Sequence, residues 1–207
     1  MIDGQIRPSE VTDSGVIAAF EAIPREEFVP ASLQGVAYVD EDIAVADGRY
    51  LMAPMVLARL VQAAAIEADD NILDVGCTSG YASAVLSHLG GSVTALEEDE
   101  KLAAQATTLL KTLGRAGVTV VRGSLAAGHK ARAPYDVILV DGSFDELPAE
   151  LERQLAEGGR LVGIRNVAGV GKAVLYVKTG GVMGCRELFD AAVPPLPGLQ
   201  KPAGFQF

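Results

Sequence analysis

The sequence predicts an α/β protein built on an open, doubly wound, mostly parallel sheet of seven strands, with a helical segment in front of it. Its 207 residues are 49% hydrophobic and 21% charged, the balance of one globular domain. From residue 71 onward, short β-branched runs alternate with helical patterns, which is typical of βαβ units. We therefore expect a single domain over 1–207, made of a helical N-terminal attachment (1–66), an α/β core (71–190) and a Pro-rich tail (191–207).

Two predicted helices lie in the N-terminal attachment, where residues 9–66 look helical and capped. Thr12 or Asp13 can cap a helix over 16–22, because either side chain can accept a hydrogen bond from a free backbone amide. Pro54 can open a second helix over 55–65, where its missing amide costs nothing.

The core elements follow in regular alternation. The predicted strands are 71–75, 92–97, 118–122, 135–140, 159–164, 173–177 and 182–188. Helices over 82–89, 100–113 and 148–155 connect them, and glycines follow or lie near their ends. Gly180-Gly181 indicates a turn between the last two strands, which we expect to be antiparallel. The prolines of 193–198 prevent the tail from continuing a strand or helix.

Composition excludes several classes of function. Lys and Arg number 17 against 27 Asp and Glu, and a net charge of -10 disfavours nucleic acid as a partner. There is no export-type leader and no apolar run long enough to cross a membrane, so a cytoplasmic protein is expected. Two histidines leave little material for a metal site or a Ser-His-Asp triad, and no metal is predicted. Cys77 and Cys185 are both expected to be buried free thiols.

A cofactor loop is predicted directly after the first core strand, because ligands of open α/β sheets bind at the carboxyl ends of strands. A dinucleotide fingerprint would place glycine at 76, 78 and 81, whereas this chain has Gly76, Thr78 and Tyr81. The loop with Gly76 and Gly80 still turns tightly, and it suits an adenosine-methionine skeleton without a pyrophosphate.

Two acidic residues flank this loop. Glu97 ends the second core strand, where a carboxylate can accept hydrogen bonds from both ribose hydroxyls. Asp74 would be costly if buried without a partner, so it either bonds loop amides or cofactor waters, or has a structural capping role.

With these residues placed, the chain resembles protein-L-isoaspartate O-methyltransferases, which have the Rossmann-like fold of class I S-adenosylmethionine-dependent methyltransferases. The resemblance covers nearly the whole chain. It is carried by the stretches 5–8, 11–13, 23–30, 37–38, Asp40, 72–76, 79–81, 133–138 and 158–162.

The resemblance implies methyl transfer from S-adenosylmethionine to the carboxylate of an isoaspartyl residue in a damaged protein or peptide. Implied cofactor-binding residues are Asp74, Gly76, Cys77, Thr78, Gly80, Tyr81, Glu97, Ser124 and Leu125. Implied or candidate substrate-loop residues are Tyr50, Leu51, Met52 and Asp141. A carboxylate acceptor is already ionised near neutral pH, so the reaction needs alignment and exclusion of water and no general base.

Three positions depart from the family pattern. The family reads Gly-Gln-Thr-Ile-Ser, one residue and Pro where this chain has residues 48–54, so Met52 replaces the presumed catalytic serine. No catalytic residue is therefore assigned. Thr78 replaces a glycine and is expected to crowd the adenosyl moiety, since a β-branched residue prefers negative φ. Ser124 replaces an aspartate that faces adenine and can still accept a hydrogen bond.

These departures leave alternatives open. The chain is either an isoaspartyl methyltransferase, a member repurposed for a small acceptor such as a carboxylic acid, or a catalytically silent binding module. Asp141 either faces the substrate or starts a turn with Gly142. The sequence does not give the oligomeric state.

Overall fold

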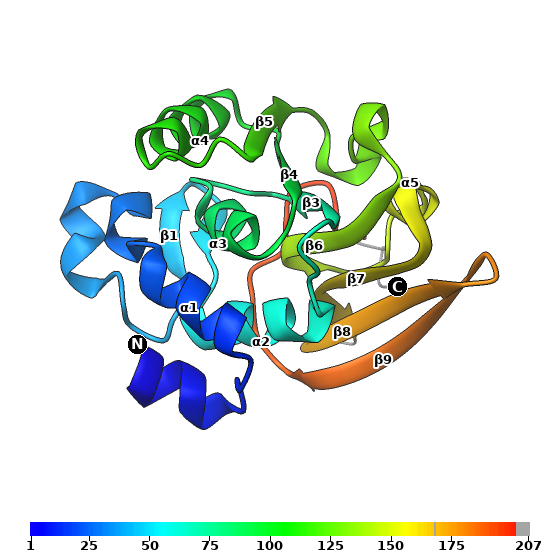
Figure 1. Cartoon of the computed structure of the whole chain (residues 1–207), viewed down its shortest axis with the longest axis horizontal. Coiled ribbons are helices and arrows are strands. Elements are labelled where there is room, and N and C mark those ends of the chain that lie inside the picture. Colours follow the sequence, from blue (N-terminus) through cyan, green and yellow to red (C-terminus); the bar gives the residue numbers. More distant parts are fainter. Residues whose placement is uncertain (168, 202–207) are drawn as a thin grey trace, which may run out of the picture.

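The computed structural model describes residues 1–167 and 169–201, and its centre is a sheet of seven strands (Figure 1). The order across the sheet is β5-β4-β3-β6-β7-β8-β9. The strands are β3 (Asn71–Val75), β4 (Ser92–Glu97), β5 (Val118–Arg122), β6 (Tyr135–Phe144), β7 (Leu155–Val167), β8 (Val170–Thr179) and β9 (Val182–Asp190). The first five in this order pair in parallel, and β8 and β9 each pair antiparallel with their neighbours. The predicted fold class is confirmed.

Apolar side chains alternate between the two faces of the sheet and build two hydrophobic cores. Ile72 belongs to the core that contains α3 (Tyr81–Leu89) and the N-terminal helices, while Leu73 belongs to the core under α5 (Ala149–Gln154). α4 (Glu100–Thr112) packs against β4 and β5 at the edge of the sheet. The crossover helices and the first three core strands thus lie where the pattern predicts them.

The N-terminal attachment is only partly helical. α1 (Ser14–Ala22) and α2 (Pro54–Ala64) form as expected, and the Asp13 carboxylate caps α1 by accepting the Val16 amide at 2.9 Å. Short helical turns and a hairpin fill the remainder: η1 (Ile2–Ile6), η2 (Arg7–Ser9), η3 (Arg25–Phe28), η4 (Ala31–Val36), β1 (Ile43–Ala46) and β2 (Arg49–Leu51). The expectation that 9–66 looks helical is confirmed for α1 and α2 and was wrong for residues 43–51, where Gly48, with φ +64°, turns the chain between β1 and β2.

β6 is longer than predicted. It continues through Asp141 and Gly142 to Phe144, with a register irregularity between Leu139 and Ser143. The interpretation of Asp141-Gly142 as a turn was wrong, because the tail supplies a further pairing partner there: Ser143 forms a parallel bridge with Pro195.

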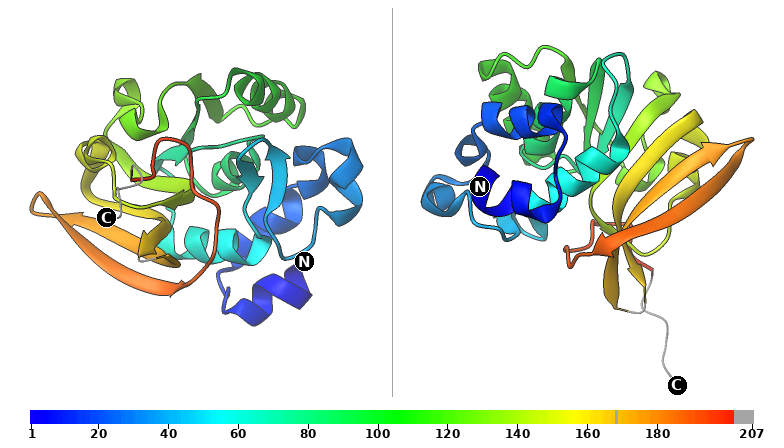
Figure 2. Two further views of the ribbon diagram at one scale, coloured as in Figure 1. Left: turned by 180° about the vertical axis from the view of Figure 1, so that it is seen from behind. Right: turned by 60° about the horizontal axis from the view of Figure 1, so that its bottom comes forward.

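The tail crosses back over the sheet after β9 and ends beside the carboxyl ends of β3 and β6 (Figure 2). The Ser143 amide donates to the Pro194 carbonyl at 3.1 Å, and the Leu196 amide donates to the Ser143 carbonyl at 2.9 Å. Leu196 and Leu199 are buried in the core under α5. The tail is therefore packed as part of the domain up to Lys201, and its predicted residues 202–207 lie outside the described residues.

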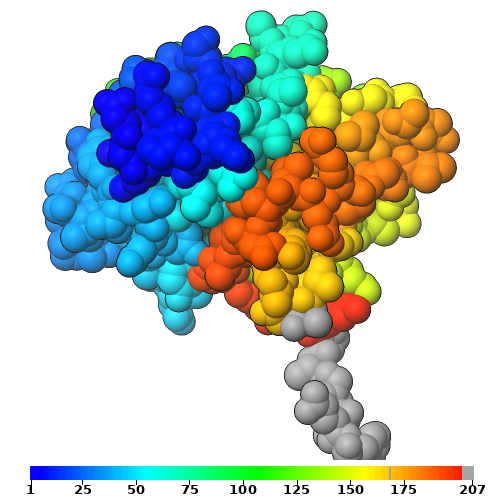
Figure 3. All heavy atoms as spheres, turned by 90° about the horizontal axis from the view of Figure 1, so that it is seen from below, coloured from blue at the N-terminus to red at the C-terminus, as the bar shows by residue number. Residues whose placement is uncertain are grey.

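The face seen in Figure 3 combines β9, α2 and the N-terminal residues. Arg59 of α2 lies over the Phe189 ring of β9, with its guanidinium carbon 3.8 Å from the ring centroid. Within the described residues, no helix combines the length and the hydropathy needed to cross a bilayer. Cys77 is buried as expected. The expectation that Cys185 is also buried was wrong: this side chain is exposed on β9, the strand at the edge of the sheet.

Candidate functional site

The predicted cofactor loop lies between the end of β3 and the start of α3. Gly76 and Gly80 adopt φ of +86° and +94°, conformations that favour glycine, and the Gly80 amide closes the turn on the Cys77 carbonyl at 2.7 Å. Thr78 adopts φ +49°, is fully buried, and its hydroxyl has no hydrogen-bond partner among the described residues. Thr78 thus adopts a backbone conformation that a β-branched residue disfavours, and the expectation that it crowds the adenosyl moiety stays a prediction.

Glu97 lies at the carboxyl end of β4, fully buried beside this loop. Its carboxylate accepts hydrogen bonds from three backbone amides: Thr78 at 2.9 Å, Glu98 at 2.9 Å and Asp99 at 3.0 Å. The same carboxylate forms a bidentate ion pair with Arg49, in which Nη2 donates to Oε2 at 2.7 Å and Nη1 donates to Oε1. Both carboxylate oxygens are thus engaged by the chain itself.

Arg49 is the residue that sequence reasoning missed. It is the first residue of β2, and only 4% of it is exposed. It stands where the family pattern has glutamine, and that replacement was the available signal. No local pattern reveals its partner, because the hairpin and β4 come together only in the folded chain.

Leu196 covers the same loop from the tail. A Cβ atom added at Gly76 would lie 2.8 Å from Leu196 Cδ2 and 3.4 Å from Arg49 Nη2. A Cβ atom added at Gly142 of β6 would lie 2.6 Å from Leu196 Cγ. The leucine and the guanidinium therefore converge on the loop glycine at the carboxyl ends of the strands.

The site does not fit S-adenosylmethionine in this arrangement. Arg49 holds the carboxylate predicted to accept the ribose, and Leu196 lies against Gly76, which the methionine or ribose portion would have to approach. Of the predicted cofactor residues, the structure brings together Asp74, Gly76, Cys77, Thr78, Gly80 and Glu97.

The other predicted cofactor residues lie differently. The Tyr81 ring packs between Phe28, 5.4 Å away between centroids, and the Arg25 guanidinium, 4.8 Å from the ring centroid. Ser124 is exposed at the start of a short turn, η5 (Leu125–Ala127), and Leu125 is buried in the core under α5.

Two further buried carboxyl groups, Asp74 and Asp141, lie at the ends of β3 and β6. Asp74 Oδ2 accepts the Ser83 hydroxyl of α3, so within the described residues this carboxyl group bonds a helix side chain and no loop amide, while its expected contact with cofactor waters stays a prediction. Burial, with the nearby Glu97 charge, raises the pKa of Asp74 to about 7. Burial and the Asp74 charge raise the pKa of Asp141 well above its ordinary value, and neither Asp141 oxygen has a hydrogen-bond partner among the described residues.

The candidate substrate loop is held rigidly. Arg25, itself fully buried, donates from Nη2 to the Met52 carbonyl at 2.8 Å. The Ala53 amide donates to Asp42 Oδ1 at 2.7 Å. Leu51 and Met52 are each 1% exposed, whereas Tyr50 is half-buried. Met52 therefore faces the protein interior, with its side chain in the core that contains α1 and α2.

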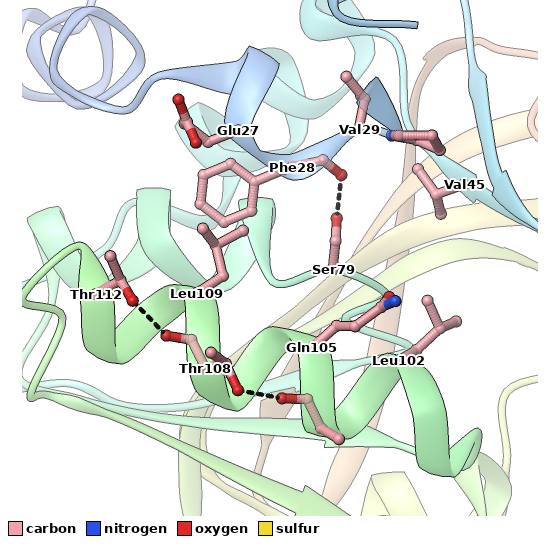
Figure 4. A pocket seen from close by; sticks show the side chains of 12 residues that line it. Glu27, Phe28, Val29, Val45, Ser79, Leu102, Gln105, Thr108, Leu109 and Thr112 are labelled. Carbon is pink, nitrogen blue, oxygen red and sulfur yellow. Dashed lines mark hydrogen bonds between the residues drawn. The ribbon is translucent and has the colours of Figure 1, made fainter. Parts of the chain in front are cut away.

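An open cavity of about 610 Å³ lies between α4 and the η3 segment (Figure 4). Phe28 and Glu27 line it from one side, and Gln105 and Leu109 of α4 line it from the other. Ser79, in the loop between β3 and α3, also lines the cavity, and its hydroxyl donates to the Phe28 carbonyl at 2.6 Å. None of the predicted cofactor residues lines this cavity.

Comparisons with known proteins agree with the fold. The model of the family described as protein-L-isoaspartate(D-aspartate) O-methyltransferase matches residues 1–184. The chain is 38% identical over 202 residues to a protein-L-isoaspartate O-methyltransferase of Koribacter versatilis (strain Ellin345), covering 97% of this chain and 90% of the relative. It is 36% identical over 197 residues to protein-L-isoaspartate O-methyltransferase 2 of Anaeromyxobacter sp. (strain Fw109-5), covering 95% and 81%.

Two solved structures share this architecture. One, a protein-L-isoaspartate O-methyltransferase, superposes with a TM-score of 0.83 at 26% identity; 91% of this chain is covered, and the chain spans 63% of that structure. The other, a putative protein-L-isoaspartate O-methyltransferase of Plasmodium falciparum in complex with S-adenosyl-L-homocysteine, has a TM-score of 0.77 at 20% identity, covering 92% and 94%, and supports the fold. The sequence, the sheet order and these matches agree: the chain belongs to the protein-L-isoaspartate(D-aspartate) O-methyltransferase family, whose members use S-adenosylmethionine.

Proposed function

We propose that this protein transfers a methyl group from S-adenosylmethionine to a carboxylate, that of an isoaspartyl residue in a damaged protein or peptide. The observation that carries the proposal is the family match over 1–184, which includes the loop after β3, Glu97 and the segment before α2. The two relatives described above are named for this activity, and their alignments cover 95% and 97% of the present chain.

Residue roles follow as proposals from position and chemistry. Glu97 and the loop around Gly76 and Gly80 are proposed to hold the nucleoside, and Ser124 to accept a hydrogen bond from adenine. When bound, the cofactor supplies the activated methyl group. No side chain is assigned to the proton chemistry, because an ionised carboxylate can act as nucleophile directly.

Asp141 is a candidate for contact with the acceptor. Burial and the Asp74 charge raise the pKa of this carboxyl group and so favour its protonated form, and a protonated carboxyl group can donate a hydrogen bond. Such a donor would orient an acceptor carboxylate, a role that Met52 cannot perform because its thioether has no proton to donate.

The two cysteines are compatible with a reducing compartment. Both cysteines are free, and Cys185 is exposed without a disulfide partner. We infer a cytoplasmic location, since exposed free thiols persist where thiols are kept reduced.

Methyl transfer to an isoaspartyl peptide tests the proposal, with the matching aspartyl peptide as the control substrate and radiolabelled S-adenosylmethionine as the donor. Met52→Ser places a hydroxyl group at the buried position where the family has serine, and a rate increase on the order of tenfold would correspond to one hydrogen bond from that hydroxyl to the acceptor carboxylate. Met183→Ser on β9 serves as the matched control and should leave the rate unchanged. Absence of transfer by both the natural protein and the folded Met52→Ser variant would contradict the proposal.

A further inference from the structure

The buried ion pair between Arg49 and Glu97 has the geometry of a complete binding interaction. Both guanidinium Nη atoms engage the two carboxylate oxygens, and the side chains are 4% and 0% exposed. A planar guanidinium matches a carboxylate bidentately and retains its charge under all ordinary conditions. Three backbone amides complete the carboxylate's hydrogen bonds, so no acceptor site remains open for two ribose hydroxyls.

A second, independent contact closes the other side of the loop. Leu196 is 4% exposed and lies where a Cβ atom at Gly76 or Gly142 would collide with it. Backbone hydrogen bonds on both sides of Pro195 fix the leucine at this position. The tail that carries it lies beyond residue 184, where the match to the family model ends, but within the reach of the alignment to the Koribacter versatilis relative, which covers 97% of this chain.

From these contacts we infer that Arg49 and Leu196 are an internal occupant of the cofactor site. Arg49 competes with the ribose for Glu97, and Leu196 competes with the cofactor for the surface of Gly76. The inference rests on the proposed function, in which Glu97 binds the nucleoside. Its consequence is that the cofactor binds only to the fraction of molecules in which both groups have moved away, which weakens the apparent affinity by that fraction.

Arg49 also offsets the cost of burying the Glu97 carboxylate. An unpaired charge at the Glu97 position would be costly, and Arg49 neutralises it from within the chain. The arrangement in which Arg49 pairs with Glu97 and Leu196 lies against Gly76 is therefore stable. Binding of the cofactor requires the free energy needed to break these contacts.

Calorimetric titration with S-adenosylhomocysteine tests the inference on four variants of the full chain. Arg49→Gln removes the competing charge, Arg49→Lys keeps the charge but loses the bidentate geometry, and Leu196→Ala removes the apolar cover while leaving the ion pair in place. Arg153→Gln, an exposed arginine on α5, is the matched control for loss of one positive charge. Circular dichroism checks that each variant is folded.

We expect Arg49→Gln and Leu196→Ala each to tighten binding on the order of tenfold or more, Arg49→Lys to have a smaller effect, and Arg153→Gln to have none. Adding Glu97→Gln to Arg49→Gln should abolish the gain. If Arg49→Gln fails to fold, Leu196→Ala and Arg49→Lys decide the result. Equal affinities of the natural protein, Leu196→Ala and every folded Arg49 variant would overturn the inference and leave the proposed function standing. Absence of binding by every folded variant would overturn both.

Discussion

Three buried carboxyl groups, Asp74, Glu97 and Asp141, lie at neighbouring strand ends, and Arg49 forms hydrogen bonds with only one of them. Burial raises the pKa of Asp74 to about 7 and that of Asp141 well above its ordinary value, which favours the uncharged form of both carboxyl groups. The charge of the site is thereby reduced without further cations.

Asp74 gives the folding stability a specific pH dependence. The folded protein keeps the Asp74 proton up to about pH 7, whereas the unfolded chain loses it near 3.8, so the free energy of unfolding should fall as pH rises through this interval. Asp74→Asn, which has no charge to gain, should flatten this fall. Urea unfolding between pH 4 and pH 8 measures it, with the exposed Asp69→Asn as control. An unchanged slope in Asp74→Asn would contradict the assignment.

At this scale the sequence predicted Glu97 and the loop glycines correctly in position, because strand ends and turns leave local patterns. It did not predict Arg49 as their partner. An ion pair across 48 residues depends on how the β1–β2 hairpin docks, and no periodicity encodes that.

Among the elements, the tail differs most from its prediction. Its prolines do end the regular strand pattern after β9, but the backbone still bridges β6 through residues next to Pro195. Residues 141–144 therefore continue β6, although Asp-Gly is a common turn pair. The pairing of β6 with the tail outweighs the local preference of Asp-Gly for a turn. The end of β6 could therefore not be predicted from the local sequence, whereas β3, β4 and β5 could.

Gly142→Ala should dislodge the tail. Its new Cβ atom would lie 2.6 Å from Leu196 Cγ, and Gly142 has no positive φ that would add backbone strain. Hydrogen exchange of the Leu196 amide, which bonds the Ser143 carbonyl, should become faster. The double variant Gly142→Ala with Leu196→Ala should recover much of the protection at the residue 196 amide. Gly35→Ala, where an added Cβ meets nothing within 4 Å, is the control.

Considered as a whole, the molecule has two cores on the two faces of one sheet. The larger core includes Ile6 and Phe20 of the N-terminal attachment together with Ile72 and Val162 of the sheet. Arg160 of β7 also binds the end of α2, donating to the Ala64 carbonyl at 3.0 Å. The attachment, the core and the tail are thus successive segments of the sequence, and their side chains pack together in shared hydrophobic cores.

Shared packing predicts that the attachment and the sheet unfold together. Differential scanning calorimetry should show one heat-capacity peak, with calorimetric and van't Hoff enthalpies that agree. A separate, earlier peak assigned to residues 1–66 would contradict it. Arg153→Gln, which changes only an exposed side chain of α5, should keep the single peak and serves as the control.

The contact between Leu196 and the two glycines has a consequence for divergence within the family. A leucine at 196 can pack as it does here only where positions 76 and 142 carry no side chain, and an arginine buried at 49 is neutralised here by the acid at 97. Within each contact, these positions should consequently change as a set when related sequences are compared. The pair 49 and 97 and the set 196, 76 and 142 are separate contacts, so a relative with glutamine at the position of Arg49 can keep an apolar residue in its tail.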